Sequence, residues 1–146
     1  MNSLKELTYK RIIPLTIISF SLVTKWWYVL PIDAPHSIMI GFPLVYSCEG
    51  WHTSMSEQYF ILEFLIDLLF YFTVWFVLIY SIDRFIIKRK LNKIITIVLF
   101  GISGVSLLLT IFIVFNTDNM FYLKRNFEIK TIETQPKFIW KYIVRP

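Results

Sequence analysis

The chain has a single cysteine, Cys48, so no disulfide can form within it. Two further absences concern charge: the segment 94–115 has no charged residue, and the segment 31–58 has no lysine or arginine. Internal repeats and low-complexity segments are also lacking. The helices of a soluble bundle carry polar residues at helical spacing. The uncharged run 94–115 therefore argues against a soluble helical bundle.

Apolar residues are abundant and come in long runs. They make up 56% of the chain, and aromatic residues alone make up 18%. Three runs approach or exceed the roughly 20 residues that a helix needs to cross a bilayer; they cover residues 12–30, 59–82 and 94–115. We therefore predict an all-α integral membrane protein, with three transmembrane helices in a single membrane domain over residues 1–146.

The segments between these runs differ in character. The connection 31–58 contains several helix breakers, and its apolar stretch "SIMIGFPLVY" is too short to span, so we expect it to lie along the membrane or to dip in partway. The turn 83–93 is strongly basic. In the tail 116–146, two β-leaning segments lie on either side of Gln135 and Pro136, which predicts a short β-hairpin.

Positive charge is placed beside the apolar runs. The net charge is +5, but lysine and arginine flank the runs, where they meet lipid phosphates, so lipid is favoured over nucleic acid as the partner. The N-terminus and the turn 83–93 are basic, which predicts that both are cytoplasmic and that the loop 31–58 and the tail are outside. The residues expected to contact lipid headgroups are Arg84, Lys88, Arg89, Lys90 and Lys93.

Two carboxylates, Glu63 and Asp67, lie one helical turn apart near the start of the run 59–82. A charge inside the membrane needs a partner, water or the interface. With antiparallel helices, Lys25 of the first run would lie at a similar depth, so we predict an ion pair between Lys25 and Asp67 or Glu63. Tyr71, one turn further on, could complete a proton relay. Alternatively, Glu63 lies among the headgroups and only Asp67 needs a partner.

The outer loop contains residues able to bind a metal or to act as nucleophile and base. These are His36, Cys48, Glu49 and His52. Their spacing matches no known metal or catalytic signature. We therefore favour an ordinary surface loop and expect no cofactor.

The third run contains "GISG", with Gly101 and Gly104. Small residues let a second helix approach closely. The motif predicts helix packing, either within this chain or against a second membrane protein.

The stretches "GFPLVYSCEGW" and "LIDLLFY" resemble a loosely defined set of small, uncharacterised bacterial multi-span membrane proteins. The matching positions are Gly41 to Leu44 and Leu65 to Tyr71. The resemblance implies a bacterial inner-membrane protein and brings no activity with it.

These observations favour a non-enzymatic accessory or structural membrane protein that acts through helix packing and its outer loop. Its expected partners are the bilayer and either a second copy or a larger membrane protein. Two alternatives stay open. One is an oligomeric transporter or proton-linked channel that uses Glu63 and Asp67. The other is an extracytoplasmic enzyme or metal site around Cys48 and His52.

Overall fold

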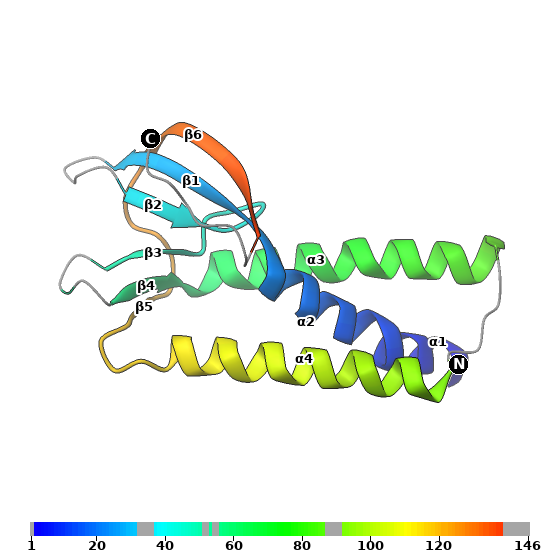
Figure 1. The fold of residues 1–146 in the computed structure, drawn as a ribbon. Helices are drawn as coiled ribbons and strands as arrows, with labels where there is room; N and C mark the ends of the chain where they lie inside the picture. The colour runs from blue at the N-terminus through cyan, green and yellow to red at the C-terminus, as the bar shows by residue number, and fades with distance from the viewer. Residues whose placement is uncertain (1, 32–36, 51–52, 54–55, 87–91, 139–146) are drawn as a thin grey trace. The chain divides into compact units, whose positions relative to one another are not determined.

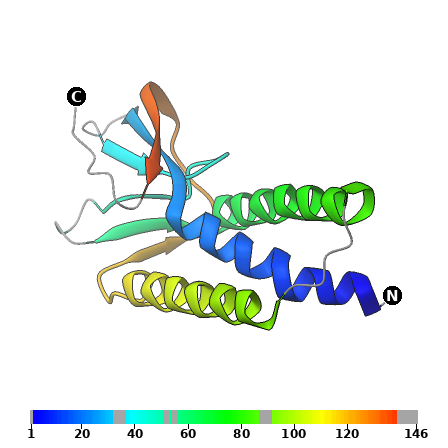
Figure 2. The same cartoon turned by 45° about the vertical axis from the view of Figure 1, so that its right-hand side comes forward.

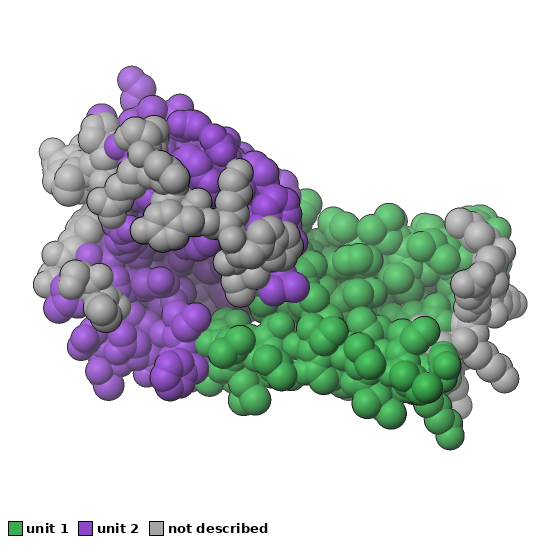
Figure 3. Space-filling model, in the orientation of Figure 1, with its two compact units in different colours: residues 1–21, 68–111 green, residues 22–67, 112–146 purple. Residues whose placement is uncertain are grey.

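The computed structural model describes residues 2–31, 37–50, 53, 56–86 and 92–138. The chain divides into two compact units, one of residues 1–21 and 68–111 and the other of residues 22–67 and 112–146 (Figure 3). We call these unit 1 and unit 2. Unit 2 contains a six-stranded sheet. The prediction of an all-α protein with three transmembrane helices is therefore wrong.

Unit 1 is helical. Its N-terminal segment is a continuous helical stretch of α1 (Asn2–Leu7), a π-helical turn η1 (Thr8–Ile12) and α2 (Ile13–Leu22). Helix α3 (Ile61–Ser81) continues into a second π-helical turn, η2 (Ile82–Ile86), and α4 (Lys93–Val114) follows. Residues 61–67 at the start of α3 and 112–114 at the end of α4 belong to unit 2. In both views the N-terminal stretch lies between α3 and α4 (Figures 1 and 2).

The N-terminal stretch runs antiparallel to α3. Trp75 Nε1 of α3 donates a hydrogen bond of 2.8 Å to Ser19 Oγ of α2. Nearer the N-terminus, Arg11 Nη1 lies 3.9 Å from Asp83 Oδ1 of η2. The basic N-terminal segment and the start of the basic turn therefore lie at the same end of unit 1.

Two helical stretches are long and apolar enough to cross a membrane, Ile61–Phe85 and Lys93–Val114. The 22 residues of α4 extend about 33 Å, close to the ~30 Å of a bilayer's hydrocarbon core. Inside the protein, only 11% of the first apolar window and 6% of the second is buried. A core helix of a soluble protein would be mostly buried, so the described chain leaves the apolar surface of both helices largely uncovered.

The sheet of unit 2 has the strand order β5-β4-β3-β2-β1-β6 (Figure 1). Neighbouring strands are antiparallel except for β4 and β5, which are parallel. The strands are β1 (Val23–Pro31), β2 (Ser37–Ile40), β3 (Ser47–Glu49), β4 (Glu57–Phe60), β5 (Met120–Tyr122) and β6 (Ile129–Phe138). Strands β2 and β3, and the first two residues of β4, come from the predicted outer loop 31–58.

The predicted first transmembrane run, 12–30, is half helix and half strand. The helix ends at Leu22, and β1 begins at Val23. The segment "VTKWWYVL" is rich in β-branched and aromatic residues, which favour strands. It also has two strands to pair with, because Trp27 lies opposite both Met39 of β2 and Thr134 of β6. Hydropathy alone does not distinguish the helical half of this run from the half that forms a strand.

The tail does not form the predicted hairpin within the described residues. Instead, β6 runs continuously through Gln135 and Pro136 and pairs with β1, with Pro136 opposite Lys25. Proline cannot donate to a neighbouring strand, so it is tolerated on an edge strand. Strand β6 is such an edge.

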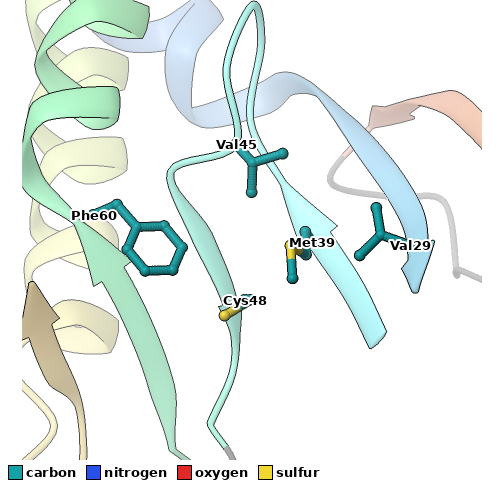
Figure 4. Close-up of a cluster of buried hydrophobic side chains, with 5 residues drawn as sticks. All are labelled: Val29, Met39, Val45, Cys48 and Phe60. Carbon is teal, nitrogen blue, oxygen red and sulfur yellow. The ribbon is translucent and has the colours of Figure 1, made fainter. Parts of the chain in front are cut away.

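A buried cluster on one face of the sheet contains four aliphatic or sulfur-containing side chains and one aromatic ring. The buried cluster consists of Val29, Met39, Val45, Cys48 and Phe60 (Figure 4). Because β-strand side chains alternate between faces, the registered positions Met39 and Cys48 fall on the same face. The core therefore joins four successive segments of the chain, from β1 to β4.

Strands β4 and β5, which pair with each other, lie next to the two membrane-length helices in the sequence. Strand β4 ends at Phe60, and α3 begins at Ile61. After α4, the side chain of Asn119 donates to the carbonyls of Ile113 and Val114, and it accepts a 2.9 Å hydrogen bond from Glu57 N at the start of β4. Asn119 thus caps the C-terminal end of α4 and also binds the start of β4.

Candidate functional site: two carboxylates at the start of helix α3

Helix α3 buries its acids and exposes its apolar side chains. Its buried residues are Glu63 and Asp67, which are 8% and 0% exposed. Leu65 and Ile66, on the same two turns, are 53% and 41% exposed. This is the reverse of a helix that packs its apolar face on a protein core and turns its charges to water.

Asp67 binds the turn between β2 and β3. Its Oδ2 accepts a 2.6 Å hydrogen bond from Phe42 N, and its Oδ1 accepts one of 2.8 Å from Leu44 N. Pro43, between them, has no amide hydrogen to satisfy. Both oxygens of the carboxylate therefore accept hydrogen bonds from backbone amides. Hydrogen bonds to an ionised carboxylate are charge-assisted and strong.

Gly41 is required for the same turn. Its φ is +151°, and a Cβ placed there would lie 1.9 Å from Leu44 O. Gly41 N donates to Lys25 O at 2.9 Å, and Gly41 O accepts from Trp27 Nε1 at 2.8 Å. The turn Gly41–Val45 is thus fixed by β1 on one side and by Asp67 on the other.

Glu63 binds a different segment of unit 2. Its Oε1 accepts a 3.2 Å hydrogen bond from Arg125 N, in the connection between β5 and β6. Its Oε2 is buried and has no hydrogen-bond partner among the residues that the structure describes. The two acids therefore attach two separate connections of the sheet to the first two turns of α3.

Lys25 does not approach these acids as predicted. It lies on β1, and its Nζ is 4.0 Å from the centroid of the Trp27 ring, a cation–π contact. Within the described part of the chain, no ion pair joins Lys25 to Glu63 or Asp67. The ring of Tyr71 packs edge-on against Phe20 of α2, with centroids 5.5 Å apart. The backbone amides of Phe42 and Leu44 bind Asp67 in place of the predicted lysine.

The predicted loop residues are not brought together as a site. Cys48 is 2% exposed in the core of unit 2, whereas Glu49 is exposed. His36 and His52 lie outside the described residues. Among the residues described, no group of three or more histidine, cysteine or acidic side chains could hold a metal ion.

The Cys48 thiol is expected to be unreactive in the folded protein. Burial, with smaller contributions from Glu57 and Glu49, raises its pKa from 9.0 to about 12, so the reactive thiolate is scarce at neutral pH. Modification by N-ethylmaleimide at pH 7 should be negligible in the folded chain and complete after denaturation. Mass spectrometry measures this directly, because the chain has one cysteine. Rapid modification of the folded chain, with its unfolding transition intact, would contradict the assignment to the core.

The remaining predicted residues lie on the helical unit or outside the described chain. Arg84 of η2 and Lys93 at the start of α4 are exposed, and Lys88, Arg89 and Lys90 are outside the described residues. A Cβ added at Gly101 or at Gly104 would meet no described atom within 4 Å. These glycines therefore have free space beside them rather than a close helix from the described chain.

No protein-family model matches the chain, and no curated protein or solved structure shows significant similarity to it.

Proposed function

We propose that the protein is a non-enzymatic accessory or structural membrane protein. In this proposal α3 and α4 cross the bilayer, the N-terminal helical stretch lies along α3, and the six-stranded sheet lies at the membrane surface where α3 begins and α4 ends. Its partners are the bilayer and either a second copy or a larger membrane protein.

The inverted burial of α3 carries this proposal. Water would favour the opposite arrangement, with Glu63 and Asp67 exposed and residues such as Leu65 buried. Hydrocarbon favours what is observed, because an apolar side chain costs nothing there and a carboxylate needs an internal partner. The exposed side chains of α4 extend the same surface, with Leu108 67% and Phe112 82% exposed.

Charge supports an orientation with the basic turn in the cytoplasm. Arg84 of η2 and Lys93 at the start of α4 are exposed. The contact between Arg11 and Asp83 places the basic N-terminal segment at the same end of unit 1. Cytoplasmic segments are enriched in lysine and arginine. We therefore propose a multi-pass protein of the bacterial inner membrane with a cytoplasmic N-terminus.

The contacts of the acids and of the thiol support a structural role over transport or catalysis. Both Asp67 oxygens are engaged by fixed backbone amides, whereas a proton relay needs groups that can exchange partners. The Cys48 thiol is buried and has a raised pKa, whereas a nucleophilic cysteine needs exposure and a lowered pKa.

A pair of arginine substitutions tests the membrane assignment. Leu108 of α4 and Thr131 of β6 are both exposed, so water would accept arginine equally well at either position. If α4 crosses a bilayer, Leu108→Arg costs at least ~2.5–3.5 kcal/mol and Thr131→Arg costs little. We expect the wild type and Thr131→Arg to stay in the membrane pellet after carbonate washing. Leu108→Arg should lose integrated protein and melt at a lower temperature in lipid.

Two results would contradict the proposal. One is release of the wild-type chain into the carbonate supernatant. The other is equal membrane retention and equal melting temperatures for the two arginine variants.

A further inference from the structure

We propose that the Gly41–Val45 turn lies at the lipid boundary beside the second turn of α3, and that Phe42 and Leu44 contact lipid acyl chains. The inference rests on the proposed membrane insertion of α3 and deepens it. It makes part of the sheet unit a re-entrant, lipid-contacting element.

The composition and exposure of the turn fit lipid better than water. All five of its residues are uncharged and apolar or glycine, whereas turns facing water are usually polar. Phe42 is 38% exposed and Leu44 is 39% exposed. These two side chains flank Pro43 at the tip of the turn.

The position of the turn along α3 follows from Asp67. The carboxylate of Asp67 accepts from Phe42 N and Leu44 N, so the turn lies beside that residue. Asp67 is six residues after the start of α3, which corresponds to about 9 Å along the helix. The neighbouring helix residues Leu65 and Ile66 are themselves exposed. A lipid environment around α3 would therefore also surround the tip of the turn.

The amide hydrogens of Gly41, Phe42 and Leu44 have partners within the protein, as lipid requires. Non-helical backbone is tolerated at membrane depth only where the protein itself supplies hydrogen-bond partners. Gly41 N donates to Lys25 O, Phe42 N and Leu44 N donate to Asp67, and Gly41 O accepts from Trp27. In water these amides could bind solvent, and a buried carboxylate would not be needed. The Asp67 carboxylate is therefore the internal acceptor for a turn that lipid covers.

The neighbouring surface of unit 2 changes from apolar to cationic toward the start of α3. Leu62 N, in the first turn of α3, donates a 3.0 Å hydrogen bond to Leu123 O, and Leu123 is 78% exposed. The next residue, Lys124, is exposed and cationic. Lysine at this level complements anionic headgroups. Lipid acyl chains therefore fit the apolar surface beside Asp67, and lipid headgroups fit the positive charge of Lys124 beside the first turn of α3.

Site-directed spin labelling tests the inference in reconstituted protein. In a Cys48→Ala background, single cysteines replace Phe42, Leu44, Leu108 and Thr131, and each spin-labelled protein is placed in phosphatidylcholine–phosphatidylglycerol vesicles. Oxygen concentrates in lipid and a nickel chelate stays in water, so the ratio of their collision rates reports the environment of the label. We expect Phe42→Cys and Leu44→Cys to resemble Leu108→Cys, with ratios several-fold above that of Thr131→Cys.

The controls separate failure of this inference from failure of the proposed function. If the label at Leu108 is in water, α4 is not in the membrane, and both proposals fall. If Leu108 is in lipid while Phe42 and Leu44 match Thr131, the turn faces water and only this inference is overturned. Crosslinking of the wild-type chain to a photoactivatable lipid provides a second test. Crosslinks in Gly41–Val45 support the inference, and crosslinks in α4 without any in the turn overturn it.

Discussion

Replacing Asp67 with alanine is expected to destabilise the protein by about 3–6 kcal/mol. Asp67 is fully buried and accepts two charge-assisted hydrogen bonds, each worth about 1.5–3 kcal/mol. Its removal leaves Phe42 N and Leu44 N without their acceptor in a site that water does not reach. Thermal unfolding of the purified protein in detergent, followed by circular dichroism, measures the loss. At roughly 3 °C per kcal/mol, the melting temperature should fall by roughly 10–20 °C.

Two further variants make the Asp67 result specific. Asp118 is exposed, so Asp118→Ala controls for the loss of an aspartate and should change the melting temperature little. Asp67→Asn keeps one acceptor oxygen but replaces the other with a donor, so its stability should lie between those of wild type and Asp67→Ala. Equal melting temperatures for Asp67→Ala and Asp118→Ala would show that the carboxylate does not hold the turn.

Replacing Gly41 with alanine is expected to cost about 2.5–6 kcal/mol. The φ of +151° is unfavourable for any side chain, at about 1–3 kcal/mol. The new Cβ would lie 1.9 Å from Leu44 O, so the backbone of the turn must move. Movement of Leu44 weakens its 2.8 Å hydrogen bond to Asp67 and adds about 1.5–3 kcal/mol. The same melting experiment measures the effect.

Gly104 provides the matched control for Gly41. A Cβ at Gly104 has free space, and alanine is favoured over glycine in a helix by about 0.5–1 kcal/mol. Gly104→Ala should therefore leave the melting temperature unchanged or raise it slightly. Because Gly41 and Asp67 act on one turn, the costs of Gly41→Ala and Asp67→Ala should combine to less than their sum. Strictly additive costs would mean that the glycine and the acid stabilise separate features.

The sequence was a good guide where one local property decides the structure. The uncharged run 94–115 corresponds closely to α4, and the run 59–82 to α3. The run 12–30 misled because its second half is apolar but pairs as a strand. The partners of β1 are β2, a few residues ahead, and β6, about a hundred residues later. Such pairing depends on the rest of the sheet, which a local reading of hydropathy does not include.

The candidate site shows the same division. Two acids in a run apolar enough to cross a membrane predicted partners within the protein. Asp67 has such partners in the amides of Phe42 and Leu44. The identity of the partners was missed, because a search among side chains finds cations such as Lys25 and overlooks backbone donors. One signal was present. Gly41 and Pro43 flank Phe42 in an apolar turn, and a turn of that kind leaves amide hydrogens in need of an acceptor.

The parallel pairing of β4 with β5 has a mechanical consequence. Strand β4 leads into α3 without an intervening residue, and β5 follows α4 after a short connection closed by Asn119. Separating the ends of the two helices would slide one strand past the other and break the ladder from Gln58–Met120 to Phe60–Tyr122. The β4/β5 ladder thus ties the start of α3 to the segment that leaves α4, and a force that pulls these two segments in opposite directions along the strands acts as shear between β4 and β5.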